Sequence, residues 1–165
     1  MKREAYVKMT DLVRERKALR AAVIWSDRLL TKLAYIIYPV FVIILFIKKD
    51  PDAVRALLVP GISFGAVSLF RWAFRAPRPY EVFETTPVIK KNTKGKSFPS
   101  RHVFSIFVIG ASIMWFSPLW GAALMAAGAV MAAARVLGGV HFPRDVIAGA
   151  LIGAGCGIAG FWLIP

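Results

Sequence analysis

Five apolar runs follow one another along the chain, separated by polar or charged residues. They span residues 33–47, 56–70, 103–116, 119–134 and 146–164. A bilayer core about 30 Å thick needs about 20 helical residues, so the last run is long enough alone and the others must extend into their flanks. The pattern predicts an all-α fold, a polytopic membrane helix bundle with about five transmembrane helices. Buried helices of a soluble protein are the alternative, but the runs leave almost no polar face to cover them.

The first 30 residues differ from these runs. They mix eight Lys and Arg with four acids, and apolar side chains recur among them at roughly helical spacing. This composition is typical of an amphipathic helix that lies in the membrane interface, so we expect such a helix over residues 1–30. The segment lacks the apolar stretch and cleavage site of a secretory signal, and we do not expect its removal. The whole chain, residues 1–165, is predicted to be one membrane-embedded domain.

Composition supports an integral membrane protein, most simply one of the cell membrane. The 165 residues are 58% apolar, whereas ordinary soluble domains have about 45–50%. The formal charge is +13, yet Arg135, Arg144 and Asp145 are the only charged residues after position 101. A basic domain that binds nucleic acid is rarely this apolar, so membrane lipids are the expected partners and nucleic acid is not. A single cysteine, Cys156, cannot close an intrachain disulfide.

The long polar connection over residues 71–101 is the most informative segment. It carries eight basic residues and two acids, and connections of this length in compact proteins usually serve a function. If successive helices alternate in direction, both ends of this connection meet the end of the 119–134 helix and the start of the 146–164 helix. The two histidines of the chain, His102 and His141, both fall at this meeting point.

Several arginines around two histidines predict a site for a phosphate-like oxyanion, because guanidinium groups match its oxygens through paired hydrogen bonds. His141 and Asp145 lie four residues apart, so the carboxylate can accept a hydrogen bond from one imidazole nitrogen and leave the other free to attack. His102 has no carboxylate nearby in sequence and suits the complementary role of donating a proton to a leaving alkoxide. Ser100 stands at a predicted helix start, where it can cap the helix or donate its hydroxyl to an anion.

A metal site is not expected, because one carboxylate and two histidines among arginines would repel a divalent cation. No cofactor is predicted either. The remaining basic residues near the site form a rim that attracts anionic lipid. They are Lys90, Lys91, Lys94, Lys96, Arg101 and Arg144.

Three ordered motifs resemble those of the type 2 phosphatidic acid phosphatase superfamily, which includes membrane lipid phosphatases and soluble vanadium haloperoxidases. The family patterns are Lys, six residues, Arg-Pro; then Pro-Ser-Gly-His; then Ser-Arg, five residues, His, three residues, Asp. The matching segments are Arg71 with Arg78-Pro79, Pro99-Ser100-Arg101-His102, and Ala134-Arg135 with His141 and Asp145. The match covers residues 71–145.

The resemblance implies a role for each matching residue. His141 would be the nucleophile that forms a phosphohistidine, Asp145 would orient it, and His102 would protonate the leaving group. The predicted phosphate-binding residues are Arg71, Arg78, Ser100, Arg101 and Arg135.

The predicted function is metal-independent hydrolysis of a phosphomonoester or diphosphate of a lipid. Candidate substrates that the family implies are phosphatidic acid, phosphatidylglycerophosphate and polyprenyl phosphates or diphosphates, undecaprenyl diphosphate among them. The alternative is a non-catalytic membrane protein that binds anionic lipid and keeps the phosphate site, and Arg101 and Ala134, which depart from the family pattern, favour it. Haloperoxidase-like oxidation is disfavoured because the related enzymes are soluble.

Two arguments about the membrane face of the site conflict. Membrane members of the family usually have six transmembrane helices and a site that faces the cell exterior, and here residues 1–30 stand where the first would be. Nineteen Lys and Arg lie on the site side of the predicted bundle against three on the other, so the positive-inside rule places the site in the cytoplasm. The face and the oligomeric state are left open.

Overall fold

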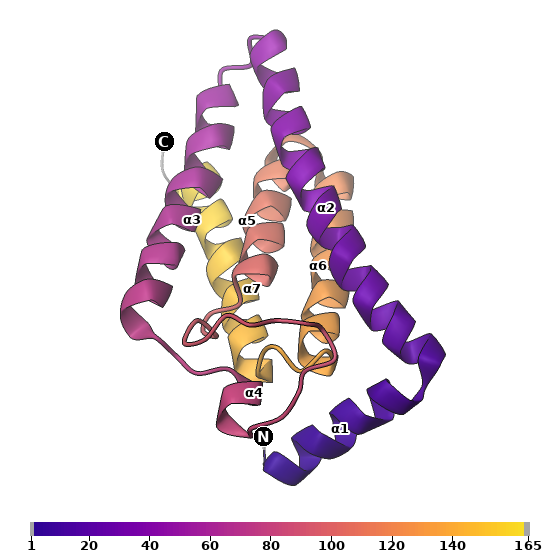
Figure 1. Cartoon of the computed structure of the whole chain (residues 1–165). Coiled ribbons are helices and arrows are strands. Elements are labelled where there is room, and N and C mark those ends of the chain that lie inside the picture. The colour runs from indigo at the N-terminus through magenta and orange to yellow at the C-terminus, as the bar shows by residue number, and fades with distance from the viewer. Residues whose placement is uncertain (1, 164–165) are drawn as a thin grey trace.

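The computed structural model describes residues 2–163, and within this range the chain is helical with no strand (Figure 1). This confirms the predicted all-α membrane bundle. The helices are α1 (Arg3–Glu15), α2 (Lys17–Ile47), α3 (Ala53–Phe74), α4 (Pro79–Val82), α5 (Arg101–Phe116), α6 (Pro118–Leu137), α7 (Pro143–Ile158) and a final π-helical turn (Ala159–Leu163).

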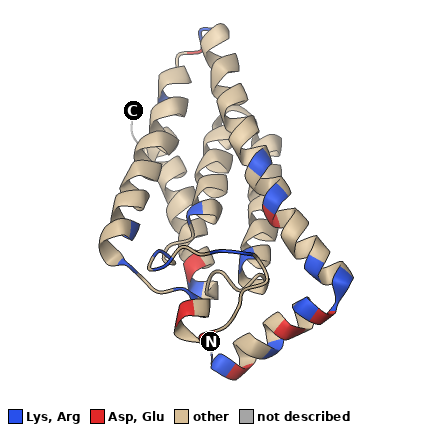
Figure 2. Cartoon of the chain, in the orientation of Figure 1, with Lys and Arg blue, Asp and Glu red and all other residues tan. Residues whose placement is uncertain are grey.

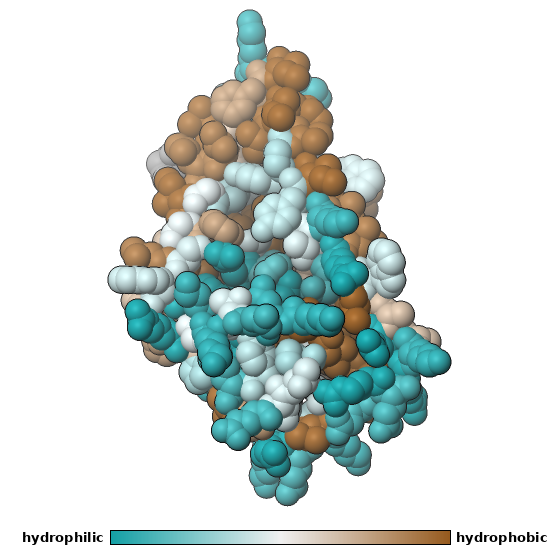
Figure 3. All heavy atoms as spheres, viewed as in Figure 1, coloured by the Kyte–Doolittle hydropathy of each residue, from teal (hydrophilic) through white to brown (hydrophobic). Residues whose placement is uncertain are grey.

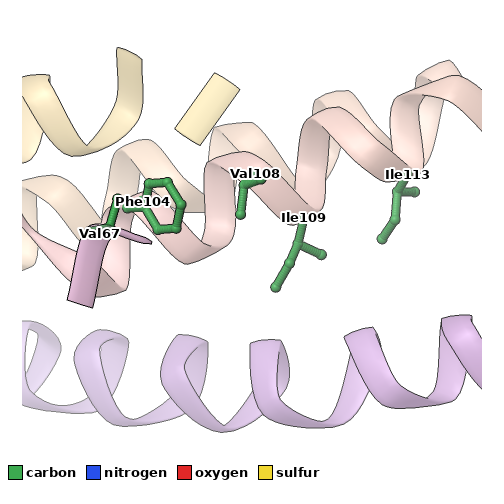
Figure 4. Packing of buried hydrophobic residues seen from close by; sticks show 5 residues of the cluster. All are labelled: Val67, Phe104, Val108, Ile109 and Ile113. Carbon is green, nitrogen blue, oxygen red and sulfur yellow. The ribbon is translucent and has the colours of Figure 1, made fainter. Parts of the chain in front are cut away.

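The centre of the bundle is α5, which packs mainly against α7 and α6 and also contacts α3. One face of α5 carries Phe104, Val108, Ile109 and Ile113, which form a buried apolar cluster with Val67 of α3 (Figure 4). Its 16 residues give a length of about 24 Å at 1.5 Å per residue, less than a bilayer core. The predicted third run is therefore the core around which the longer helices pack.

Four segments are long and apolar enough to cross a membrane: Lys17–Ile47, Ala53–Val82, Pro118–Leu137 and Pro143–Leu163. Their outward faces carry exposed aliphatic and aromatic side chains, and apolar residues dominate the upper part of the surface in Figure 3. Polar residues gather over the opposite end of the molecule, where Figure 2 places most of the basic residues. The chain thus has an apolar body suited to lipid and one strongly basic end.

The N-terminal segment is two helices and not one, which corrects the predicted helix over residues 1–30. The break falls at Arg16, whose backbone is extended, and residues 17–30 begin the long helix α2 that continues into the first apolar run.

One face of helix α1 packs against the rest of the protein, because Tyr6, Thr10 and Val13 are buried. The Tyr6 hydroxyl donates a hydrogen bond to the Gly139 carbonyl at 3.0 Å, and the Tyr6 and Phe83 rings lie 5.0 Å apart. Helix α1 therefore lies against the polar loops at the basic end of the bundle.

Close contact between α5 and α7 depends on two glycines of α7. A Cβ atom at Gly149 would lie 2.6 Å from the Ser100 carbonyl oxygen, and one at Gly153 would lie 2.5 Å from the Phe104 carbonyl oxygen. Both atoms belong to the backbone of α5, so they cannot rotate away. The helices can approach this closely because neither glycine has a side chain, as is common where helices pack in lipid.

Replacing Gly153 by alanine is therefore expected to destabilise the protein by about 1–3 kcal/mol, because α5 and α7 must separate to admit the methyl group. Gly155 is the matched control: it lies in the same helix with no atom within 4 Å of its Cβ position. Gly155→Ala should leave stability unchanged or raise it by up to about 1 kcal/mol through helix propensity. Thermal unfolding of the two variants in the same detergent measures the difference, and equal melting temperatures would contradict the packing argument.

Candidate active site

The structure brings the segments named by the three motifs together at the basic end of the bundle. They come from the end of α3 and the loop after it, the start of α5, the end of α6 and the start of α7. The predicted site residues that are buried there are Arg71, Arg78, Ser100, Arg135, His141 and Asp145.

His141 lies in the short connection between α6 and α7, with its side chain 1% exposed. Its Nε2 atom is 3.4 Å from Nη1 of Arg78, and the same Arg78 nitrogen donates to the Val140 carbonyl at 2.9 Å. A guanidinium can only donate hydrogen bonds, so the Nε2 atom turned toward it carries a lone pair. The proton of the neutral imidazole then resides on Nδ1, which leaves the Nε2 lone pair available.

Burial, followed by the positive charges of Arg78 and Arg135, lowers the pKa of His141 to about 4, although Asp145 opposes the shift. At neutral pH the ring is therefore neutral, which is the form that the predicted nucleophilic role would require.

Asp145 stands behind the His141 ring at the start of α7, and it is fully buried. Its Oδ2 atom is 3.6 Å from Nδ1 of His141, slightly longer than a hydrogen bond. The same oxygen accepts a hydrogen bond from the Ser97 hydroxyl at 2.5 Å and another from the backbone N–H of Phe142 at 2.9 Å. The carboxylate is thus fixed from two sides and faces the nitrogen that carries the proton.

Ser97 was not found from the sequence. It lies two residues before the second motif, where no spacing rule marks it as a partner of a carboxylate.

Ser100 is the N-cap residue of α5, as the sequence predicts, but its hydroxyl makes no capping hydrogen bond. The hydroxyl oxygen is buried and has no hydrogen-bond partner within residues 2–163. The backbone N–H of Ser100 donates to the Asp145 carbonyl at 2.8 Å, which ties the start of α5 to the start of α7. The free hydroxyl at a helix start is a suitable donor to an anion.

Arg71 reaches a different set of partners from the one that the motif implies. Its guanidinium donates to the backbone carbonyls of Lys96, Ser97 and Pro99, so it clamps the loop that leads into α5. Arg78 also donates to the Lys96 carbonyl, at 3.0 Å. Direct phosphate binding by Arg71 stays a prediction; in the structure its contacts shape the loop around Ser100.

Arg135 lies in the last turn of α6, its side chain is 3% exposed, and it is paired with Asp27 of α2. The Nε atom of Arg135 lies 2.7 Å from Oδ1 of Asp27. From the sequence alone, Asp27 is one of the four acids of the N-terminal segment. The signal that could have found it is an isolated acid at the start of an apolar helix, where an ionisable group needs a partner.

His102 and Arg101 are among the residues that line an apolar cavity of about 250 Å³ between α2, α3 and α5. Tyr35, Tyr38 and Phe64 are among the residues that line it. The Arg101 guanidinium carbon lies 5.1 Å from the centre of the Phe64 ring, so this cation stands at the cavity and not among the buried arginines. His102 therefore links the basic site to a lipid-compatible cavity.

Lys91 is half-buried, unlike Lys90, Lys94 and Lys96 of the predicted basic rim, which are exposed. Burial lowers the pKa of Lys91, and the positive charges of Arg135 and Arg78 lower it further. The loop is fixed near it, since the N–H groups of residues 88 and 89 both donate to the Gly138 carbonyl, at 3.0 and 3.1 Å. Lys91 thus belongs to the site electrostatically.

Within residues 2–163 no three His, Cys, Asp or Glu side chains are grouped as a metal would require. Cations surround His102, His141 and Asp145, the three residues that the sequence predicts to be catalytic.

The sequence profile of the PAP2 superfamily matches residues 52–165, which is more than half of the chain. The chain belongs to the PAP2 superfamily. This confirms the resemblance drawn from the three motifs, which all lie inside the matched range. Its departures from the family pattern, at Arg71, Arg101 and Ala134, are therefore features of a true member.

Two relatives are similar to this PAP2 chain over part of their length. The bacitracin transport permease protein BcrC of Bacillus licheniformis is 35% identical over 89 residues, which cover 52% of this chain and 44% of that protein. An undecaprenyl-diphosphatase of Sulfolobus acidocaldarius is 29% identical over 124 residues, which cover 73% of this chain and 59% of that protein. The chain thus spans about half the length of these relatives.

Two crystal structures share the fold. LpxE of Aquifex aeolicus has 25% sequence identity and a TM-score of 0.71, with 93% of each chain covered. The first transmembrane PAP2-type phosphatidylglycerolphosphate phosphatase from Bacillus subtilis has 19% identity and a TM-score of 0.65, covering 94% of this chain and 90% of that one.

Proposed function

We propose that the protein is a membrane lipid phosphatase that hydrolyses a phosphomonoester or diphosphate of a lipid through a phosphohistidine intermediate. The observation that carries this proposal is the position of His141. Its Nε2 lone pair lies 3.4 Å from a guanidinium nitrogen of Arg78, and Asp145 stands behind the other ring nitrogen. This arrangement supports nucleophilic attack on a group that arginines hold by its oxygens.

In the first step the Nε2 lone pair of His141 forms a bond to phosphorus while the bond from phosphorus to the lipid oxygen breaks. The electron pair of the broken bond stays on the lipid oxygen, which takes a proton from His102. Asp145 stabilises the positive charge that develops on the His141 ring, and the cations hold the phosphoryl oxygens.

In the second step water attacks phosphorus, gives its proton to His102 and releases inorganic phosphate. The bond between phosphorus and Nε2 breaks, and its electron pair returns to His141. His102 lies near the positive charges of Arg135, Lys91 and Arg101. These cations disfavour a protonated His102, and the negative charge of a bound phosphate offsets their effect.

The apolar cavity beside His102 supports a lipid substrate whose chain leaves the site between α2, α3 and α5. The panel that tests the proposal contains phosphatidic acid, phosphatidylglycerophosphate, and polyprenyl phosphate and diphosphate. Phosphate release by the full chain in detergent with EDTA is the measurement. Release from one of these lipids supports a metal-independent lipid phosphatase. Lipid binding without release from any of them would favour the non-catalytic lipid-binding alternative, and activity that returns with a divalent ion would contradict metal independence.

Replacing His102 by glutamine is expected to slow hydrolysis of a lipid alkyl phosphate by about 10² to 10⁴-fold, the range for loss of a general acid. The loss should be much smaller for an aryl phosphate, whose leaving oxygen needs no proton. The comparison of kcat/KM for the two substrates measures this, and an equal loss for both would contradict the proton-donor role.

The pH dependence should show a nucleophile that stays neutral in mild acid. Because the pKa of His141 is lowered to about 4, kcat/KM should hold down to about pH 5 and fall only below it. A histidine with the ordinary pKa of about 6.5 would be half protonated at about pH 6.5 and almost fully protonated at about pH 5. The second ionisation of the phosphate, about pH 6, is measured separately by phosphorus NMR so that it can be subtracted. An enzyme ionisation near pH 6.5 on the acid limb would contradict the prediction.

A further inference from the structure

Asp27 is a buried acid at the basic end of the bundle that the proposed reaction does not use. It lies near the start of the apolar part of α2 and is 8% exposed. Its Oδ1 atom is 2.7 Å from Nε of Arg135, and within the described residues it is the acidic partner of that arginine. Lys91 and Arg28 add positive charge around it.

The ion pair between Asp27 and Arg135 is not expected to add much to the stability of the folded protein. Replacement of a buried ion pair by apolar residues is often neutral or stabilising, because two charges must be taken out of water to form it. An ionisable side chain in a membrane helix therefore points to a function, and the residue that it pairs with indicates what that function is. Here the partner is one of the arginines at the site.

The pair places a carboxylate at one edge of the Arg135 guanidinium, as an ion-pair contact at 2.7 Å in which the Nε–H is not aligned as a hydrogen bond. Of the five N–H donors of arginine, one is on Nε and four are on the two Nη atoms. Asp27 lies on the Nε edge, so the Nη donors are left for a ligand. The backbone of Arg135 is fixed as well, since its carbonyl accepts hydrogen bonds from the N–H groups of Val140 and His141 at 3.2 and 3.3 Å.

Residues that follow Asp27 on the same face of α2 line the apolar cavity. Thr31 lies four residues further along, one helical turn away, and it lines the cavity together with His102. Tyr35 and Tyr38 follow on the cavity wall. Asp27 thus stands where the cavity meets the phosphate-binding residues.

We infer that Asp27 is a positioning residue, which holds Arg135 so that its Nη donors meet the phosphoryl oxygens as His141 attacks. This inference rests on the proposed phosphatase function. It gives α2 two tasks: its polar end orients a phosphate-binding arginine, and its next turns line the path of the lipid chain.

The test is a double-mutant cycle on the full chain in detergent, with Asp27→Asn, Arg135→Ala and the double variant. Two quantities are measured, namely kcat/KM for the best lipid of the panel and inhibition by orthovanadate, which binds as a phosphate analogue. Asp27→Asn is expected to lower kcat/KM and vanadate affinity by about 10 to 100-fold, the scale of a displaced catalytic group. In the Arg135→Ala background the same change should alter both by less than about twofold, because residues that act as a unit are not additive.

Two further variants keep the test decisive. Asp27→Glu keeps the charge but moves the carboxylate, so its kcat/KM and vanadate affinity should lie between those of wild type and Asp27→Asn. If Asp27→Asn does not fold, Asp27→Glu takes its place in the cycle. Asp11→Asn is the matched control: Asp11 also pairs with an arginine, Arg14 at 2.6 Å, but on the exposed face of α1. It should leave both quantities unchanged.

The outcomes separate the two proposals. If wild type releases no phosphate from any lipid, the phosphatase proposal is wrong, and vanadate binding then tests Asp27 alone. If wild type is active and both Asp27 variants match it, or if the losses of Asp27→Asn and Arg135→Ala multiply in the double variant, the positioning role is wrong and the phosphatase function stands.

Discussion

Replacing His141 by alanine is expected to abolish phosphate release, with kcat falling by at least about four orders of magnitude, as when the nucleophile of a covalent mechanism is removed. The reason is specific to the geometry. The His141 Nε2 lone pair faces Arg78 at 3.4 Å, and the other histidine of the chain, His102, lines the apolar cavity instead. Phosphate release from the active lipid, in detergent with EDTA, measures the loss.

The covalent intermediate gives a second and independent measurement. Wild-type protein quenched during turnover of a lipid labelled with ³²P should carry an acid-labile, base-stable label on the chain, and His141→Ala should carry none. Orthovanadate binding should survive in the variant, because the arginines that hold the oxygens remain. Label retained by His141→Ala would place the nucleophile elsewhere. Loss of vanadate binding together with activity would show a collapsed site and not a missing nucleophile.

The convergence of the site could be predicted because it follows from the lengths of the apolar runs. Each run fixes where a helix ends, and alternating directions then bring residues 71–101, Arg135 and His141 to one end. The spacing of four between His141 and Asp145 likewise fixes them at one helix start. Helix length and residue spacing are local properties of the sequence. The structure agrees with the predictions made from them because they do not depend on which helices pack together.

The parts that could not be predicted depend on contacts between distant segments. Nothing at Arg16 marks a break, since neither proline nor glycine is there, and the charge pattern of residues 1–30 continues across it. Because residues 17–30 were assigned to that segment, Asp27 did not stand out as an acid in a membrane helix. Ser97 and the loop-directed contacts of Arg71 depend on how the connection after α3 folds back, which helical periodicity does not describe.

Replacing Asp145 by asparagine is expected to lower kcat by about 10³ to 10⁴-fold, the loss seen when the acid behind a catalytic histidine becomes an amide. The carboxylate faces Nδ1 of His141 at 3.6 Å and accepts from Ser97 and the Phe142 N–H. The amide nitrogen of asparagine would have to donate where these groups also donate, so one polar contact is lost or the His141 ring turns. The rate of phosphate release at saturating lipid measures this loss.

The pH profile distinguishes an orienting acid from a merely structural one. Asp145 raises the pKa of His141 against the stronger effect of burial, so its removal should move that pKa below about 4. The acid limb of kcat/KM should therefore move to lower pH in Asp145→Asn, even though the maximum rate falls. Asp50→Asn, at the opposite end of the bundle, makes the same chemical change and should alter neither quantity. An acid limb that moves to higher pH would mean that Asp145 does not stabilise the charged His141 ring. Its large effect would then have to come from the hydrogen bonds that tie α7 to Ser97.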